Sequence, residues 1–260
     1  MPDFSSLLQR LTPDGPGFVI EATPDWLQGR TLYGGLSAAL CLEATLRSLS
    51  NLPPLRSAHF SFAGPASGSL SVCPTVLRQG KSSVSVGVDL SGDVGFAVRG
   101  ILTFGAARAS ALSYLDIPAP ASQHPDACVN FLRGGGAPIF MQHFDMRQAG
   151  EHFPVSGAPV PDLLLWVRHH ETSGADPIVA LLALADAPPP AAMAMFDRPA
   201  PISTITWAIN IIAVPSHAGW RLIRSRGESV ADGYASQNMT IWDETGAPLI
   251  TAQQNVAVFI

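Results

Sequence analysis

Charged residues are scarce in this chain of 260 residues: 13% are Asp, Glu, Lys or Arg, against roughly a quarter in an average soluble domain. Lysine occurs once, as Lys81, and the 15 basic residues are outnumbered by 20 acidic ones, which gives a formal net charge of −5. The arginines form no basic run or stripe, so the chain is not expected to bind nucleic acid. Isolated arginines leave phosphorylated small molecules open as ligands, because a guanidinium binds a phosphate bidentately.

Long apolar runs are also missing, although 47% of the residues are hydrophobic and the mean hydropathy is +0.24. The longest apolar block, Ile178 to Ala185, stops at Asp186, whereas a membrane helix needs about 18 or more apolar residues. The first residues, MPDFSSLLQRLTPDG, lack the basic-then-apolar layout of a secretory signal. We therefore expect no membrane span and a soluble cytoplasmic protein that buries its apolar excess in cores and in the interface of a homodimer.

Cysteine is rare, and its pattern excludes two classes of site. The three cysteines, Cys41, Cys73 and Cys128, are widely spaced and stand among apolar or small residues. An odd number at such spacings indicates neither a disulfide framework nor a zinc cage. We expect all three to be core residues.

Several catalytic motifs are absent: the sequence has no GxSxG, no GxGxxG after a strand, no GxxxxGK[ST] and no HExxH. His143, Asp145 and His152 lack further ligands from a rigid element, so no metal site is predicted. His169 and His170 end a predicted strand, where neighbouring side chains point to opposite faces, and we expect that strand end to be solvated.

Proline and glycine, 23 of each, are concentrated between Pro118 and Pro161. This stretch indicates a connection between two halves that carries one embedded strand, expected over Ile139 to Met146. Within it, Gly134-Gly135-Gly136 lacks the strand-to-helix context of a phosphate loop and predicts a flexible or tight turn. The expected domains are residues 1–120, a linker over 121–137, and residues 138–260.

The same order of elements is present on both sides of this linker, as in a repeated unit. In the first half a strand over residues 17–22 precedes an apolar helix, which Gly34-Gly35 opens and which is followed by antiparallel strands. In the second half two strands precede the short apolar helix DPIVALLALAD, and three extended runs follow it. The pattern predicts an α+β fold in which each half wraps a sheet around one buried helix and the two sheets join at their edges.

Three polar positions in the second half bear on chemistry. Asp186 ends the predicted helix, where the backbone dipole disfavours an anion. It is either an exposed acid in a turn or a general base in a poorly solvated cleft. Gln253 and Gln254 interrupt the last strand, and one of them should face the helix, which is costly without a hydrogen bond. Thr204 is by default an ordinary β-branched strand residue.

Several stretches together resemble a known family. They are WLQGRTLYGGLSAAL in the first half, and LADAPPP, STITWAINI, WRLIRSRGES and ADGYASQNMTIWDETGAPLITAQQ in the second. These segments are similar to the acyl-CoA thioesterase II-like proteins, which are tandem, or double, hotdog enzymes. The resemblance spans nearly the whole chain and agrees with the repeated layout described above. It implies hydrolysis of acyl-CoA in fatty acid metabolism, with no metal and no other cofactor.

The resemblance also implies site residues. In that family an Asp, a Ser or Thr, and a Gln activate the water that attacks the thioester. The matching positions are Asp186, Thr204 and Gln254, with Gln253 one register step away as the reserve choice. Backbone N–H groups at Gly34-Gly35 are expected to hold the carbonyl oxygen, because a helix N-terminus carries unsatisfied donors. Alternatively, the two glycines only allow close packing of the helix.

One segment departs from the family. Where thioesterase II has an acidic, His-rich strand after the Thr, this chain has Thr206, Trp207 and Asn210. The departure bears on substrate preference, and it motivates a second hypothesis, a non-catalytic protein that binds acyl-CoA or an acyl chain. A third, a hotdog hydratase, needs a D-x-N-P-x-H-like segment, which the sequence lacks.

Overall fold

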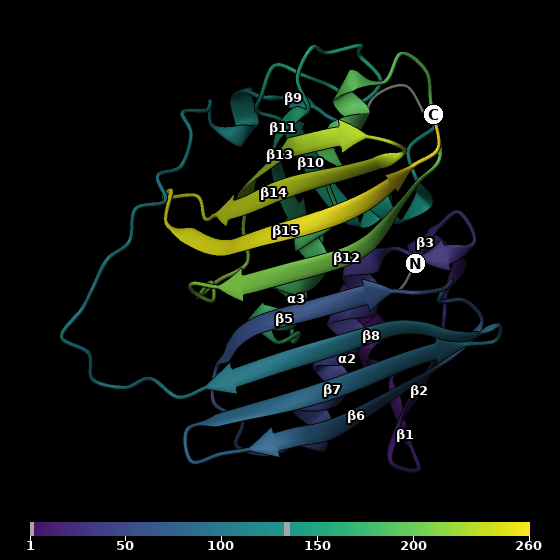
Figure 1. Cartoon of the computed structure of the whole chain (residues 1–260), viewed down its shortest axis with the longest axis vertical. Helices are drawn as coiled ribbons and strands as arrows, with labels where there is room; N and C mark the ends of the chain where they lie inside the picture. The colour runs from purple at the N-terminus through teal and green to yellow at the C-terminus, as the bar shows by residue number, and fades with distance from the viewer. Residues whose placement is uncertain (1–2, 133–135) are drawn as a thin grey trace.

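A computed structural model of the chain describes residues 3–132 and 136–260 (Figure 1). Thirteen strands form one antiparallel sheet, and β3 (Leu27–Gln28) and β4 (Thr31–Leu32) form a separate small hairpin. No helix in these ranges is long and apolar enough to cross a membrane. Gly134 and Gly135 lie outside the described residues, so the turn expected there stays a prediction.

The two halves have the same topology. In the first, the strands lie in the order β2-β6-β7-β8-β5, and in the second the corresponding order is β11-β13-β14-β15-β12. The first half consists of β2 (Gly17–Glu21), α2 (Gly34–Ser48), β5 (Leu55–Phe62), β6 (Ser69–Gln79), β7 (Ser83–Gly92) and β8 (Gly95–Gly105). The second consists of β11 (Asp162–His169), α3 (Pro177–Ala185), β12 (Ile202–Ile211), β13 (Arg221–Ala231), β14 (Tyr234–Trp242) and β15 (Pro248–Val258).

The sheets of the two halves join edge to edge through β5 and β12. The pairing runs from Ser61 opposite Thr206 to Ser57 opposite Asn210. It removes two sheet edges that each half alone would expose. The predicted α+β fold, with two sheet-wrapped helices in one continuous sheet, is therefore confirmed.

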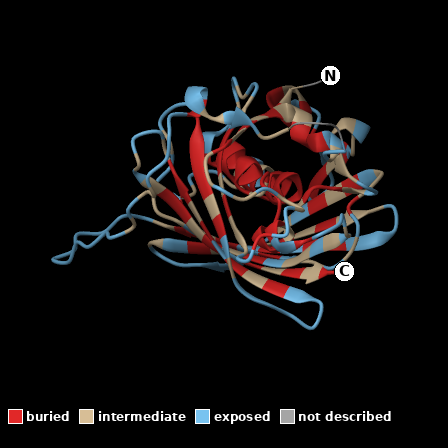
Figure 2. Ribbon diagram, turned by 90° about the horizontal axis from the view of Figure 1, so that it is seen from above, coloured by how far each residue is buried: buried red, intermediate tan, exposed pale blue. Residues whose placement is uncertain are grey.

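Both helices lie inside the curve of the sheet and pack against each other (Figure 2). Every residue of α3 from Ile178 to Ala185 is buried. Asp176 caps this helix through its side chain, which accepts a hydrogen bond from the Ile178 N–H, and Pro177 is the first helical residue, as predicted. The main hydrophobic core contains residues of both halves, so the halves share one interior.

The remaining elements lie before, within and between these units. They are α1 (Phe4–Gln9), β1 (Thr12–Asp14), η1 (Pro24–Trp26), η2 (Pro125–Ala127), β9 (Val129–Asn130), η3 (Ile139–His143), β10 (Phe144–Gln148) and η4 (Ala191–Met195). Beyond the sheet, the connection after β8 runs over the outer face of the second half, where the Trp242 Nε1–H donates to the Ile117 carbonyl at 2.8 Å.

The strand expected over Ile139 to Met146 is only half correct. Its first five residues form the 3₁₀ helix η3, and the strand β10 begins at Phe144. Pro138 precedes the turn, whose Phe140 side chain is buried and stacks on the Tyr33 ring with a centroid distance of 4.2 Å. Aromatic packing across the two halves therefore overrides the strand propensity of this segment.

The prediction that all three cysteines are core residues is wrong for two of them. Cys41 is buried in α2, but Cys128 is half-buried and Cys73 is exposed. In β6 the alternate residues Leu70 and Val72 face the core. Because neighbouring side chains in a strand point to opposite faces, Cys73 faces solvent.

Candidate active site

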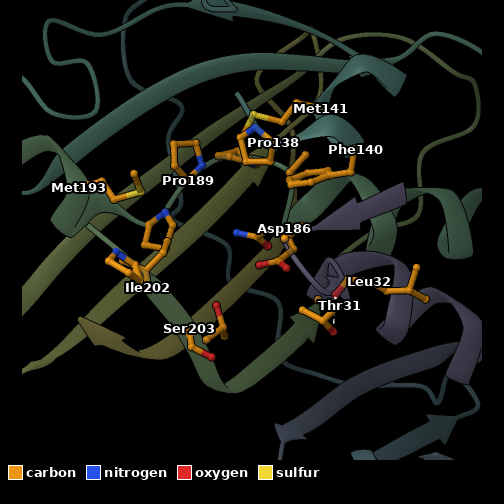
Figure 3. Close-up of a pocket in the computed structure, with 18 of the residues that line it drawn as sticks. Thr31, Leu32, Pro138, Phe140, Met141, Asp186, Pro189, Met193, Ile202 and Ser203 are labelled. Atoms are coloured by element: carbon orange, nitrogen blue, oxygen red, sulfur yellow. Dashed lines mark hydrogen bonds between the residues drawn. The ribbon is translucent and has the colours of Figure 1, made fainter. Parts of the chain in front are cut away.

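Asp186 stands where α3 ends. It is the C-cap residue, and Ala187 and three prolines follow, which cannot continue a helix. Its side chain projects into a pocket, as Figure 3 shows, with Phe140 and Met141 on one side and Ser203 on another. The predicted position of the acid at a helix C-terminus is therefore confirmed, and it faces a cavity rather than bulk solvent.

The pocket has a volume of about 920 Å³ and is lined by residues of both halves and of the connection between them. Its walls are mostly apolar, and Arg30 and Asp186 are the charged side chains among the described lining residues. Such a mixture is typical of a site that binds an apolar ligand and uses a few polar groups to fix its orientation. The larger apolar lining residues are Phe62, Phe131, Phe140, Met141, Phe153 and Met193.

The surroundings of Asp186 favour its protonated form. Burial raises the pKa of the Asp186 carboxyl from 3.8 to about 7, although hydrogen bonds from the Gln254 side chain and the Gly35 backbone lower it in part. The nearby Tyr33 hydroxyl donates to the Ala183 carbonyl at 3.1 Å. Burial, with a smaller contribution from the Asp186 charge, raises the pKa of Tyr33 well above its ordinary value. At neutral pH the carboxyl group therefore exists in both protonation states.

Gly34 and Gly35 allow the start of α2 to approach this carboxylate. A Cβ at Gly34 would lie 2.7 Å from Asp186 Oδ2, and one at Gly35 would lie 2.5 Å from the Ala183 carbonyl oxygen. Both glycines thus serve close packing, which is one of the two roles expected for them from the sequence. The Gly35 N–H is hydrogen-bonded to Asp186, whereas Gly34 lines the pocket. The helix has no side-chain cap, because Tyr33 at the N-cap makes no such hydrogen bond.

The two adjacent glutamines face opposite sides of β15. Gln254 is 2% exposed, and its Nε2 donates to Asp186 Oδ1 at 2.6 Å. Gln253 is exposed, and its Nε2 donates to Glu228 Oε2 at 3.3 Å on the outer face. The structure thus brings Gln254, and not the reserve choice Gln253, to Asp186. Gln254 is not part of the pocket lining, so it contacts the carboxylate from the protein side.

Thr204 reaches the same pocket through a bulge in β12. It lies opposite Val256, and Trp207 lies opposite Gln254, with a register shift between the two pairs. Facing residues of antiparallel strands share a side of the sheet, as do Gln254 and Val256, which are two apart. Thr204 and Trp207 are three apart and share that side only because Ile205 is an extra residue in the strand. Thr204 lines the pocket, but no hydrogen bond joins its hydroxyl to Asp186 in the described structure.

One buried residue near the site was not found from the sequence. Gln237 of β14 is 2% exposed, and its Nε2 donates to Gln254 Oε1 at 2.6 Å. Its own Oε1 accepts a hydrogen bond from the Ala191 N–H at 2.7 Å. A polar residue between the inward-facing Ala235 and Met239 is the signal that would have identified it, the same signal that singled out the glutamines of β15.

The three residues of β12 that depart from the family pattern, Thr206, Trp207 and Asn210, do not form the pocket. Thr206 and Asn210 are exposed, and Trp207 is buried against Phe60, with ring centroids 6.2 Å apart. None of the three is among the lining residues of the described pocket. The altered segment after Thr204 therefore changes the sheet and its interior rather than the walls of the site.

The histidines form no cluster with the site. His143 Nε2 lies 3.1 Å from Asp25 Oδ2, while Asp145 pairs with Arg168 at 2.7 Å, and His152 lies on the loop after β10. Within the described ranges no three potential ligand side chains gather as a metal site would require.

The expectation of a solvated strand end is wrong for His169. Its Nε2 donates to the Ala180 carbonyl of α3 at 2.8 Å, and burial lowers the pKa of the imidazole to about 4. His170 and Glu171 are exposed as expected. The strand end is therefore solvated on one face only, because α3 covers the other.

Comparisons with known proteins agree with this architecture. Residues 22–105 match the family model of the acyl-CoA thioesterase N-terminal domain, and residues 117–258 match that of the acyl-CoA thioesterase C-terminal domain. No curated protein sequence matches the chain significantly.

Three solved structures are similar over their full length. A conserved protein of unknown function with a hot dog fold from Alicyclobacillus acidocaldarius is 23% identical, with a TM-score of 0.88 and coverage of 98% of this chain and 97% of that one. The tesB protein of Mycobacterium avium subs paratuberculosis is 17% identical, with a TM-score of 0.81 and 98% of both chains covered. The acyl-CoA thioesterase II TesB2 of Mycobacterium marinum is 18% identical, with a TM-score of 0.77 and coverage of 97% and 96%. These similarities confirm the predicted hotdog fold.

Proposed function

Since the chain belongs to the acyl-CoA thioesterase family and is therefore a thioester hydrolase, we propose that it hydrolyses acyl-CoA to a free carboxylic acid and CoA at Asp186. The observation that carries this proposal is a carboxyl group with a pKa of about 7 at the wall of an apolar pocket. A general base is most effective when its pKa lies near the working pH. The dimer and the cytoplasmic location stay predictions of the sequence.

Asp186 is the general base in this mechanism. Gln254 occupies Oδ1 of the carboxylate, and Oδ2 lies beside Gly34, which lines the pocket. We assign to Oδ2 the proton that leaves the attacking water. As the water oxygen bonds to the thioester carbon, the proton passes to Asp186, and when the C–S bond breaks it passes on to the sulfur of CoA. The products are the free carboxylic acid and the CoA thiol, and Asp186 returns to its ionised form.

Thr204 and Gln254 have different parts. Thr204 lines the pocket, and we assign to its hydroxyl a hydrogen bond with the attacking water. Gln254 lies behind the carboxylate, fixes its orientation, and favours its ionised form, since a hydrogen bond to the charged state lowers a pKa. Of the three residues, Asp186 is thus the base, Thr204 contacts the water, and Gln254 contacts the base.

The start of α2 supports the negative charge that develops on the carbonyl oxygen. The N-terminal N–H groups of a helix lack partners within the helix and carry a partial positive charge. The Gly35 N–H serves Asp186, so the Gly34 N–H, at the pocket wall, is the donor that we assign to the carbonyl oxygen. The six large apolar residues of the lining fit an apolar acyl chain.

Substitution of Asp186 by Asn tests the proposal, because it keeps the shape and removes the base. We expect the rate of CoA release to fall by about 100- to 10,000-fold on a panel of acyl-CoA chain lengths, measured with a thiol reagent. Asp176→Asn is the matched control: it makes the same change at the other end of α3, where Asn caps a helix as well as Asp does. Unchanged hydrolysis by Asp186→Asn would reject the assignment, and binding without CoA release by the unmodified protein would favour an acyl-CoA binding protein.

A further inference from the structure

A chain of three hydrogen bonds runs from the backbone to the carboxylate of Asp186. The Ala191 N–H donates to Gln237 Oε1 at 2.7 Å, Gln237 Nε2 donates to Gln254 Oε1 at 2.6 Å, and Gln254 Nε2 donates to Asp186 Oδ1 at 2.6 Å. Gln237 and Gln254 lie directly opposite each other on β14 and β15. Both side chains are 2% exposed, so water does not compete for these hydrogen bonds.

The two ends of this chain fix its direction. An amide group can be turned over, and it then presents an oxygen where it had presented an NH₂. A backbone N–H, however, only donates, and an ionised carboxylate only accepts. If either glutamine were turned over, two donors or two acceptors would face each other in a buried place, and each unsatisfied group there destabilises that arrangement.

The first donor in this chain of hydrogen bonds, the Ala191 N–H, follows from the sequence around it. Proline has no N–H, and residues 188–190 are all proline. Ala191 therefore offers the first backbone N–H after Ala187, and it does so at the start of η4, whose preceding residue Pro190 is extended. A rigid segment thus presents one donor to Gln237 and to no competing acceptor in the described structure.

From this geometry we propose that Gln237 is a positioning residue, which sets the amide direction of Gln254 and thereby holds Asp186 in its reactive orientation. The inference rests on the proposed role of Asp186 as the base. Gln237 lies outside the pocket lining and touches no reacting atom. Without it, Gln254 can turn, and a carbonyl oxygen then faces the carboxylate in place of an N–H.

Gln237→Met tests this role, because methionine has a similar volume and no amide. We expect kcat to fall by about 5- to 30-fold with KM little changed, since the lost hydrogen bond stabilised the ionised base. The pH at which kcat is half-maximal should rise, because the N–H of Gln254 lowers the pKa of Asp186. Gln253→Met is the control: this glutamine is next to Gln254 but lies on the outer face, and its loss should leave both quantities unchanged.

The double variant separates positioning from a general structural role. If Gln237 acts through Gln254, then Gln237→Met/Gln254→Met should be no slower than Gln254→Met alone, because the second change removes what the first one acts on. Two independent losses that multiply would overturn the inference. A slow Gln254→Met with a Gln237→Met that behaves like the unmodified protein would overturn it too, and leave the proposed function standing. Unchanged hydrolysis by Asp186→Asn would instead reject both the positioning role of Gln237 and the proposed function.

A second variant leaves Gln237 and Gln254 in place and changes the donor that Gln237 accepts from. Ala191→Pro removes the N–H that anchors Gln237 and adds two ring carbons at a buried position, and proline is accepted at the first position of a helical turn. Pro190 has φ −57° and ψ 141°, the extended conformation that a residue before proline requires. We expect the pH at which kcat is half-maximal to rise in this variant too, by less than in Gln237→Met. An unaltered pH profile in a folded Ala191→Pro protein would contradict the proposed anchor.

Discussion

Replacing Asp186 with Asn is expected to stabilise the protein at pH 8 while it removes the activity. In the unfolded chain the carboxyl group loses its proton near its ordinary pKa of 3.8, whereas in the folded protein burial raises the pKa to about 7. Between these two pH values the folded state binds more protons than the unfolded state. The free energy of unfolding therefore falls as the pH rises through this interval, and above about pH 7 the loss is constant.

The pKa values set the size of this effect. A difference of about 3 pKa units at about 1.4 kcal/mol per unit corresponds to about 4 kcal/mol at pH 8. The carboxylate borders the pocket, which gives water some access, so this value is an upper limit. Asparagine keeps an oxygen for the N–H of Gln254 but loses the stronger hydrogen bond that a charge provides. We expect a net gain of about 1–3 kcal/mol at pH 8 that disappears near pH 4.

Thermal and urea unfolding at pH 4, 6 and 8 measure this gain. For a chain of this size about 1 kcal/mol corresponds to about 2–4 °C in Tm, so the difference between Asp186→Asn and the unmodified protein should increase with pH up to about 7 and then stay level. Asp176→Asn makes the same substitution at the exposed start of α3 and is measured alongside as the control. The reasoning is refuted if Asp186→Asn is the less stable protein at pH 8, or if its gain is the same at all three pH values.

Two more predictions follow from the same site. The value of kcat/KM should rise with pH and level off above about 7, because the base must be ionised and burial holds the pKa of Asp186 near that value; a profile that is flat from pH 5 to 8 would contradict this. Gly35→Ala should lower the free energy of unfolding by about 1–3 kcal/mol, because the new Cβ would lie 2.5 Å from the Ala183 carbonyl oxygen and 2.7 Å from the Tyr33 ring. Gly80→Ala, where the nearest atom is 3.4 Å away, is the control, and an equal Tm change in both variants would exclude the contact as the cause.

The sequence predicts the parts of the site that depend on local patterns. The apolar run that ends at Asp186, with proline after it, defines a helix end without any tertiary information. The alternation along β15 predicts that one of two adjacent glutamines faces the helix, and the structure shows that it is Gln254. Local periodicity is reliable here because it states which face a residue occupies, and burial of that face is what folds the strand.

What the sequence could not predict depends on irregular pairing between strands. Trp242 lies opposite Pro248 next to the turn between β14 and β15, and regular counting from that pair places Gln253 opposite Gln237. A register shift between Ile241 and Trp242 brings Gln254 there instead. A bulge adds one residue to one strand, and beyond it each residue of that strand lies opposite a different partner on the neighbouring strand. The position of Thr204 depends on a second bulge of the same kind in β12.

The two halves share a topology but differ in polarity where the site forms. Gln237 and Gln254 lie on the inward faces of β14 and β15, while the corresponding faces of β7 and β8 are apolar throughout. The inward residues there are Val84, Val86, Val88 and Leu90 on β7, and Val98, Gly100, Leu102 and Phe104 on β8. At the end of α2 no acid stands in the place that Asp186 has after α3: Ser48 is followed by Leu49.

The N-termini of α2 and α3 also differ, in the number of backbone N–H groups that they leave without a partner. The first N–H groups of α3 are used up, because Pro177 has none and the side chain of Asp176 accepts from Ile178. The start of α2 has no side-chain cap, so its donors remain for Asp186 and, in the proposed mechanism, for the carbonyl oxygen. One half therefore supplies the base and its amide support, and the other supplies the donors. A mirrored site at the start of α3 would have neither a base nor a free helix terminus, so under this mechanism the loss of Asp186 alone leaves no second site to sustain hydrolysis.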